Sequence, residues 1–167
     1  VGLGAMGSGM AASLRRAGHA VHVFDVRESV AKAFAAEGGV ACASPAALAK
    51  ECAIVVSVVV NAAQTEQVLF GEQGAAAAMR AGSLFVMCST VDPGWSAALE
   101  ARLEAMGLLY LDAPISGGAA RAAAGQITMM TAGRPAAYAR CEGVLEAMAA
   151  KVFPLADPAG PATPLKT

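Results

Sequence analysis

Three glycines near the start of the chain, in the pattern Gly2-x-Gly4-x-x-Gly7, constrain the fold more than any other feature of the sequence. In a strand-to-helix turn of this spacing, the first glycine makes the tight turn and the second lets a pyrophosphate approach the backbone. The third lets the helix pack closely against the strand. The pattern predicts a phosphate-binding loop whose anion lies on the free amides of a helix N-terminus, with a structural glycine turn as the alternative.

Apolar strand-like runs alternate with alanine-rich helical stretches along the rest of the chain. Met6, Met10 and Leu14 recur every four residues, which predicts a helix directly after the loop. Further helices are predicted at Ser29–Glu37, Pro45–Lys50, Pro93–Met106 and Pro135–Ala149, and strands at His19–Asp25, Val40–Cys42, Ala53–Val60, Ser83–Ser89, Leu108–Asp112, Gln126–Ala132 and Lys151–Leu155. This rhythm predicts an α/β fold, a Rossmann-type doubly wound and mostly parallel sheet with helices on both faces. The run at 53–60 is expected to be its most buried strand.

Composition narrows the class of protein. With 167 residues, 56% hydrophobic and 15% charged, the chain suits one domain with a substantial core. No apolar run reaches membrane length, and a net charge of -1 without a basic patch argues against nucleic acid as a partner. Cys42, Cys52, Cys88 and Cys141 have no metal or redox spacing, so they are expected to be buried thiols of a cytoplasmic protein, and no metal site is expected.

The strand predicted at 19–25 ends in an acidic residue, Asp25. A carboxylate at this point would accept hydrogen bonds from the adenosine ribose hydroxyls and repel a 2′-phosphate, which favours NAD as the cofactor. Arg27, two residues further on, can pair with a 2′-phosphate, so NADP stays open as the alternative. A solvated aspartate at a strand end is the competing interpretation.

Four stretches of the sequence, "GLGAMGSGMA", "GHAVHVFD", "CST" and "DAPISGGAARAAAGQITMMTAG", together resemble the β-hydroxyacid dehydrogenases. That family includes 3-hydroxyisobutyrate, tartronate semialdehyde and threonate dehydrogenases and is related to 6-phosphogluconate dehydrogenase. These four stretches are most similar in sequence to the threonate dehydrogenase branch of the family. The resemblance covers the whole chain, and "DAPISGG" is its most specific part.

The resemblance also implies a domain organisation. Residues 1–155 would form the dinucleotide-binding domain, and residues 156–167 a linker and the start of the inter-domain helix. In the family an all-helical domain follows, which dimerises and closes the active-site cleft; it is absent here. Val1 is expected to be the last core residue of a truncated first strand. The chain is therefore expected to be a fragment, inactive alone and a homo-oligomer when full length.

The segment Ser116-Gly117-Gly118 suits the binding of a carboxylate. Two residues without side chains let consecutive backbone amides converge on an anion, and Ser116 adds a hydroxyl donor. In the family this segment binds the substrate carboxylate, whereas a plain loop is the alternative.

The catalytic base is implied by the resemblance alone. The family's lysine follows glycine-x-glycine and three further residues, and the matching stretch here is "GPATPLK", which places Lys166 in that role. Ala162 replaces the second glycine and Pro164 lies inside the motif, two departures from the family pattern.

Two polar residues that follow predicted strands complete the site. The resemblance implies that Thr90 lies near the nicotinamide, because the family places a threonine or serine there. Asn61 is expected either to line the cofactor groove or to cap a helix. His19 and His22 are expected to be structural or exposed, and the predicted cofactor-binding set is Gly2, Leu3, Gly4, Ala5, Met6, Gly7, Asp25, Val26, Arg27, Val60, Asn61 and Thr90.

The resemblance, together with these residues, implies NAD-dependent oxidation of a small hydroxy acid, such as 3-hydroxyisobutyrate, threonate or a glycerate-like compound. The carbinol hydrogen would leave as hydride for the nicotinamide, and Lys166 would accept the hydroxyl proton. An imine or aldehyde reductase of the same fold is one alternative. A non-catalytic module that binds a dinucleotide is the other.

Overall fold

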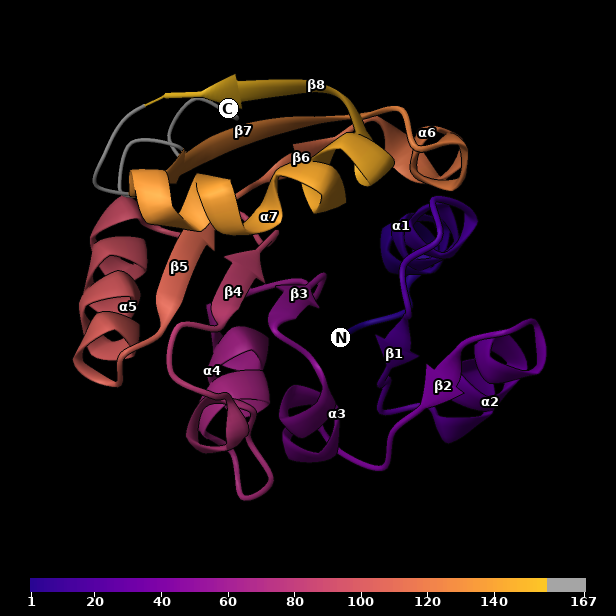
Figure 1. The fold of residues 1–167 in the computed structure, drawn as a ribbon, viewed down its shortest axis with the longest axis horizontal. Coiled ribbons are helices and arrows are strands. Elements are labelled where there is room, and N and C mark those ends of the chain that lie inside the picture. Colours follow the sequence, from indigo (N-terminus) through magenta and orange to yellow (C-terminus); the bar gives the residue numbers. More distant parts are fainter. Residues whose placement is uncertain (156–167) are drawn as a thin grey trace.

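The computed structural model describes residues 1–155 as an α/β domain (Figure 1). Its helices are α1 (Ala5–Arg16), α2 (Glu28–Ala36), α3 (Pro45–Glu51), α4 (Ala62–Phe70), α5 (Pro93–Ala105), α6 (Gly118–Ala124) and α7 (Pro135–Met148), with a 3-10 helix, η1, at Ala76–Ala78. Its strands are β1 (His22–Val23), β2 (Val40–Ala41), β3 (Ile54–Ser57), β4 (Leu84–Met87), β5 (Leu109–Asp112), β6 (Ile115–Ser116), β7 (Ile127–Gly133) and β8 (Ala149–Pro154).

The strands form two sheets. β1 and β2 pair in parallel, and a larger sheet has the order β3-β4-β5-β7-β6, with β8 also paired to β7. β3, β4 and β5 run in parallel, and β7 is antiparallel to both β5 and β6. The predicted Rossmann-type, mostly parallel sheet is confirmed.

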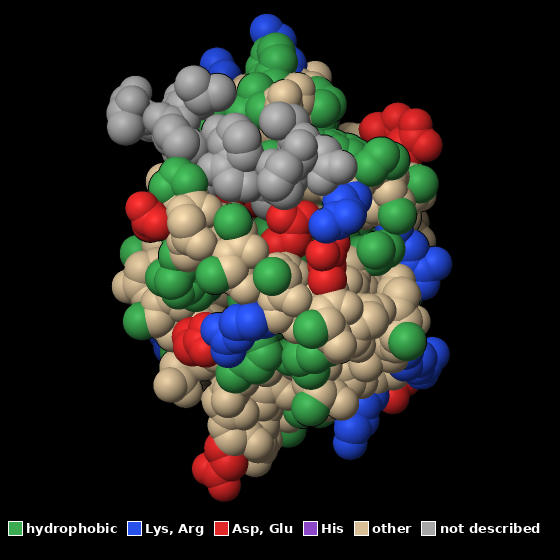
Figure 2. Space-filling view, turned by 90° about the vertical axis from the view of Figure 1, so that its left-hand side faces the viewer, with side chains coloured by type: hydrophobic (Ala, Val, Ile, Leu, Met, Phe, Trp, Pro, Cys, Tyr) green, Lys and Arg blue, Asp and Glu red, His purple; other side chains and the backbone are tan. Residues whose placement is uncertain are grey.

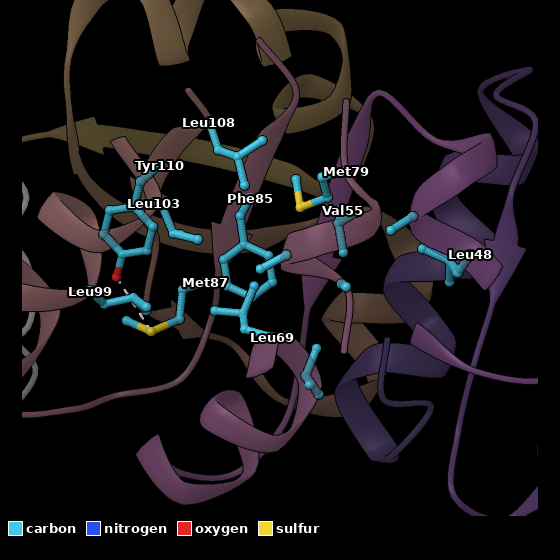
Figure 3. Packing of buried hydrophobic residues seen from close by; sticks show 14 of the residues in the cluster. Leu48, Val55, Leu69, Met79, Phe85, Met87, Leu99, Leu103, Leu108 and Tyr110 are labelled. Carbon is cyan, nitrogen blue, oxygen red and sulfur yellow. Dashed lines mark hydrogen bonds between the residues drawn. The ribbon is translucent and has the colours of Figure 1, made fainter. Parts of the chain in front are cut away.

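Helices cover both faces of the larger sheet, as β4 shows. Phe85 and Met87 point into a core shared with α3, α4 and α5, whose tight packing appears in Figure 3. Leu84 and Val86 point the opposite way, into a core built with α1, α6 and α7. This alternation follows from the two-residue period of a strand, and it explains why β4 reads as an unbroken apolar run.

β4, rather than the run at 53–60, is the most buried strand, so the expectation from the sequence is wrong on this point. All four β4 residues are 0% exposed, whereas β3 alternates between half-buried and buried positions. The difference in burial follows from the positions of the two strands in the sheet. β4 has a strand on each side, but β3 ends the larger sheet and borders a cavity of about 280 Å³ between itself and β1.

The first two residues join the two sheets across this gap. The Val1 nitrogen donates to Val56 O at 2.7 Å, and Val58 N donates to Val1 O at 2.9 Å. On the other side, Gly2 N donates to Phe24 O at 2.9 Å. Val1 and Gly2 therefore occupy strand-like positions between β1 and β3, directly before the glycine loop.

Helix starts follow the capping signals in the sequence. Ser44 Oγ accepts from Ala47 N at 3.0 Å, with Pro45 in the first turn of α3 as predicted. Asp92 Oδ1 accepts from Trp95 N at 3.0 Å and opens α5 in the same way. Each such cap contributes about 1 kcal/mol to stability.

Four elements were not predicted from the sequence: α4, η1, β6 and α6. Several predicted strands are also longer than the observed ones, for example 19–25 against the two residues of β1. α4 follows β3 after only a short loop, so the apolar run at 53–60 masks the boundary between them. α6 is seven alanine-rich residues between glycines with positive φ, Gly117 at 135° and Gly125 at 68°.

The four cysteines differ in burial. Cys88 and Cys141 are buried, as predicted, while Cys42 and Cys52 are only half-buried. Burial raises the pKa of Cys141 to about 11.

Within residues 1–155 there is no cluster of side chains able to hold a metal ion, and every helix is too short or too polar to cross a membrane. Basic and acidic side chains are interspersed on the face seen in Figure 2.

A buried polar network links α5 to β5. Ser96 Oγ donates to Asp112 Oδ2 at 2.9 Å and lies 2.9 Å from the Tyr110 hydroxyl, which donates to Met87 Sδ (Figure 3). Burial is the main cause that raises the pKa of Tyr110, with the nearby Asp112 adding to it. The network ties the end of β5 to the neighbouring helix.

We expect Ser96→Ala to destabilise the domain, because it removes a hydrogen bond to a buried carboxylate. The cost should be about 1–3 kcal/mol in the free energy of unfolding, measured by urea denaturation. Ser29→Ala, at an exposed position in α2, is the matched control and should change it by less than about 0.5 kcal/mol. Equal effects of the two substitutions would contradict a role for the network.

Candidate dinucleotide-binding site

The glycine loop is folded so tightly that two of its positions exclude a side chain. A Cβ on Gly7 would lie 1.9 Å from Gly2 O, and one on Gly2 would lie 2.8 Å from Val58 O. Gly2 also has φ of 85°, in the region that favours glycine. The glycines at positions 2 and 7 therefore have the turn and close-packing roles predicted for them.

Gly4 differs from its neighbours because it faces open space. A Cβ there would meet no protein atom within 4 Å, so its missing side chain leaves room for a ligand rather than for packing. Gly4 is also the N-cap of α1, with no side chain capping the helix and no acidic residue in its first turn. Arg15 and Arg16 occupy the last turn, where they complement the helix dipole. The positive end of α1 is thus left open for an anion.

Asp25 is held by the loop itself. Its Oδ2 accepts from Leu3 N at 2.7 Å, and its Oδ1 accepts from Arg27 N at 2.9 Å and Arg27 Nε at 3.1 Å. Burial alone would raise the pKa of Asp25, but the hydrogen bonds from Arg27 and Leu3 outweigh it and hold the pKa below its usual value. Asp25 is therefore a fixed, ionised carboxylate beside the glycine loop, not a freely solvated strand-end residue.

A cavity of about 690 Å³ opens beside this carboxylate. Val26 and Val60 stand at it with 89% and 79% of their surface exposed, which is unusual for large apolar side chains. The predicted cofactor residues that line the cavity are Gly2, Gly4, Asp25, Val26, Arg27, Val60 and Asn61. Leu3, Ala5, Met6 and Gly7 lie in the loop and the first turn of α1, as the predicted phosphate site requires.

Part of the cavity wall was not predicted from the sequence. Pro45, Gln64, Gln67 and Gln73 also line it, from α3, α4 and the segment after α4. Three are glutamines on or after a helix that the sequence did not reveal, and glutamine at such positions reads as ordinary helix surface. Predicting these residues would have required knowing that α4 lines the same cavity as the glycine loop.

Asn61 caps a helix, which is one of the two roles that the sequence left open. Its Oδ1 accepts from Gln64 N at 2.9 Å and caps α4, while Gln64 Oε1 accepts from Val60 N at 2.8 Å. Asn61 also lines the cavity. The reciprocal cap fixes the wall of the cavity at the end of β3.

The predicted carboxylate anchor runs from Ser116, the last residue of β6, to Gly118, the first residue of α6. Gly117 and Gly118 have φ of 135° and 79°, and Ser116, Gly117 and Gly118 are all exposed. β6 is antiparallel to β7, which is antiparallel to β5, so β6 points the same way as β3, β4 and β5. The anchor and the glycine loop thus lie beyond the same edge of the sheet, where open α/β sheets bind ligands.

Thr90 follows β4 at this edge and is exposed, and it does not line the cavity. Its neighbour Ser89 is buried and donates to Val59 O at 2.7 Å, which joins the ends of β4 and β3.

Lys166 and the predicted domain boundary at 155/156 lie at or beyond the limit of the described residues, so the role of Lys166 stays a prediction. His19 and His22 are half-buried, and His22 Nδ1 lies 3.8 Å from Cys42 Sγ.

Comparison with known proteins identifies the family. The sequence profile of the NAD binding domain of 6-phosphogluconate dehydrogenase matches residues 1–156. The chain belongs to this family. The predicted resemblance to the β-hydroxyacid dehydrogenases is thereby confirmed, together with NAD as the class of cofactor.

Individual relatives agree with this assignment. The chain is 55% identical over 166 residues to an L-threonate dehydrogenase of Cupriavidus necator, covering 99% of this chain and 56% of the relative. It is 33% identical to a mitochondrial 3-hydroxyisobutyrate dehydrogenase of Mus musculus, covering 91% of this chain and 45% of the relative. The chain thus spans about half the length of the curated relatives it matches.

Solved structures give the same result. The crystal structure of a 3-hydroxyisobutyrate dehydrogenase from Salmonella typhimurium superposes with a TM-score of 0.95 at 40% identity, over 99% of this chain and 57% of that one. A 3-hydroxyisobutyrate dehydrogenase of Mycobacterium tuberculosis, studied with L-serine, gives 0.91 at 33% identity, over 99% of this chain and 55% of that one.

We expect Asp25→Asn to destabilise the domain in a pH-dependent way. Because the pKa of Asp25 is lowered on folding, its contribution is present above the unfolded-state pKa, about 4, and is lost as pH falls through the folded-state value. The variant should lose about 1–2 kcal/mol of unfolding free energy at pH 7, measured by urea denaturation, and the loss should shrink below pH 4.

Asp92→Asn is the control for this measurement, because asparagine caps a helix as well as aspartate does. It should change stability by less than about 0.5 kcal/mol at pH 7. A loss at Asp25 that is the same at pH 7 and pH 3 would show that the negative charge is not what Leu3 and Arg27 stabilise.

Proposed function

We propose that the protein to which this chain belongs oxidises a small hydroxy acid with NAD as hydride acceptor. The observation that carries the proposal is that the open N-terminus of α1 and the Ser116–Gly118 turn lie beyond the same edge of one sheet. The first suits a pyrophosphate and the second a carboxylate. The relatives named L-threonate and 3-hydroxyisobutyrate dehydrogenase support the same class of substrate.

The residues present fit a dinucleotide. The backbone amides of the first turn of α1 would hold the pyrophosphate over Gly4, where no side chain intervenes. Asp25 would accept hydrogen bonds from the adenosine ribose hydroxyls. The exposed Val26 and Val60 would give apolar contact to the adenine end of the cavity. When bound, the nicotinamide supplies the site that accepts a hydride.

Asp25 and Arg27 favour NAD over NADP in this arrangement. A 2′-phosphate would meet an ionised carboxylate whose pKa is already lowered. The Arg27 side chain, which would otherwise pair with that phosphate, donates to Asp25 Oδ1 at 3.1 Å. Binding of NADP would therefore require the ion pair to break.

Substrate orientation comes from the anchor. The amides of Gly117 and Gly118, with the Ser116 hydroxyl, would donate to the substrate carboxylate and hold the carbinol carbon of the same molecule at the sheet edge. The C–H bond of that carbon breaks with its electron pair leaving as hydride, and the C–O bond becomes a carbonyl. The hydroxyl proton must then leave the oxygen.

Lys166 would receive this proton on Nζ. A free lysine has a pKa of about 10.4, so the side chain needs a partly desolvated position to act as a base near neutral pH. That assignment follows from the family motif, not from geometry. An imine or aldehyde reductase and a non-catalytic binding module remain the competing functions, and retention of a lysine with a carboxylate anchor favours the hydroxy-acid reaction.

The first test is turnover by the polypeptide encoded by the complete gene, with threonate, 3-hydroxyisobutyrate and glycerate as substrates and NAD reduction as the readout. Lys166→Ala should lower kcat by about 10²–10⁴-fold while the Kd for NAD changes little, because the base touches substrate and not the nucleotide. Full activity in the variant would remove Lys166 from the reaction. Absence of turnover with any hydroxy acid in the parent would favour the reductase or binding-module alternatives.

Cofactor preference gives a second test that needs only the NAD-binding domain. Asp25→Ala should shift the ratio of NAD to NADP affinity toward NADP by about tenfold or more, because a like charge is removed and Arg27 is released. The double variant Asp25→Ala/Arg27→Ala should lose most of that gain. An unchanged ratio, measured by titration calorimetry, would contradict the role given to Asp25.

A further inference from the structure

Helices α1 and α6 lie side by side although more than a hundred residues separate them in sequence (Figure 1). Their contact is centred on Gly9. A Cβ at Gly9 would lie 2.5 Å from Ala123 N and 2.8 Å from the carbonyl carbon of Ala122. The two backbones therefore touch, with no space for even a methyl group between them.

A second contact lies one turn further along α1. Ser13 Oγ donates to Ala122 O at 2.9 Å, and Arg16 Nη2 donates to Ser13 Oγ at 2.8 Å and also to Ala123 O. These side chains donate to carbonyls at the C-terminal end of α6, where Ala122 O also accepts from Gly125 N at 3.2 Å. α6 has only seven residues and would be marginal alone, so α1 holds it in place.

The order of these contacts shows that the helices run in the same direction. Gly9 meets Ala122 and Ala123, and Ser13, four residues later, lies beside Gly125, the C-cap of α6. Following both helices backwards by about one turn brings Ala5, at the start of α1, level with Gly118, at the start of α6. The two N-termini therefore stand next to each other.

We propose that Gly9 and Ser13 are positioning residues that fix the distance between the phosphate loop and the carboxylate anchor. This inference rests on the proposed function, since it takes the turn before α6 as the substrate anchor. Neither residue lines the cavity of about 690 Å³ beside the glycine loop. The loop is held independently, by Gly7 against Gly2 and by Leu3 on Asp25, so a wider gap at Gly9 displaces the anchor and leaves the loop in place.

Gly9→Ala tests this in the complete enzyme. The added methyl group meets backbone atoms of α6, which cannot rotate away, so the helix must move. We expect the KM for the hydroxy acid to rise by about tenfold or more, because misplacement of about 1 Å is enough for such a loss, with the Kd for NAD within about threefold. Ser13→Ala, which removes only the cap, should show the same split to a smaller extent and serves if Gly9→Ala does not fold.

Gly143→Ala is the matched control. It adds the same methyl group to an exposed helical glycine in α7, where a Cβ meets nothing within 4 Å, and should leave KM and Kd unchanged. A parallel loss of NAD affinity and substrate affinity in Gly9→Ala would overturn the proposal, since it would mean that the loop moves as well. Unchanged KM would also overturn it.

Amide hydrogen exchange on the isolated chain separates this proposal from the proposed function. In Gly9→Ala, exchange should become faster in residues 117–125 but not in residues 2–8. That result would support the positioning contact even if no hydroxy acid were turned over by the parent enzyme. A uniform change in amide exchange, or no change, would overturn the positioning role of this contact even if the enzyme is an active dehydrogenase.

Discussion

The contact between the Gly7 backbone and the Gly2 carbonyl is the constraint on which the rest of the nucleotide site depends. Because a Cβ at Gly7 would stand 1.9 Å from that oxygen, the chain can turn directly from its place between β1 and β3 into α1. The turn points the first amides of α1 beyond the sheet edge and brings Leu3 N to Asp25. Loop, helix and carboxylate are thus set by one close approach.

Local signals predicted most of the fold. The helix face of Met6, Met10 and Leu14, the caps at Ser44 and Asp92 and the apolar strands act over a few residues, and they appear where expected. The predictions that were wrong or missing concern features that depend on residues far apart in the sequence. β4 is more buried than β3 because of strand order, which no local pattern encodes. α6 is short and held by α1, so its own sequence carries little helical periodicity.

The residues of the candidate site were also predicted only where local sequence signals reveal them. Gly2, Gly4 and Asp25 were predictable because their chemistry is tied to fixed spacings, and all three line the cavity. The glutamines of α4 were not, since a polar helix surface gives no sign that it lines a cavity. Asn61 shows that a helix cap can also be part of a cavity wall, because its oxygen caps α4 while the same residue lines the cavity.

The uncapped start of α1 has a practical consequence for anyone who handles this protein. No side chain of its own neutralises or caps that helix end, so the amides that suit a pyrophosphate are equally open to small inorganic anions. Phosphate and sulfate buffers would compete with the nucleotide and lower its apparent affinity, whereas a zwitterionic buffer at low ionic strength would report the intrinsic value. Affinities measured in different buffers are then not comparable.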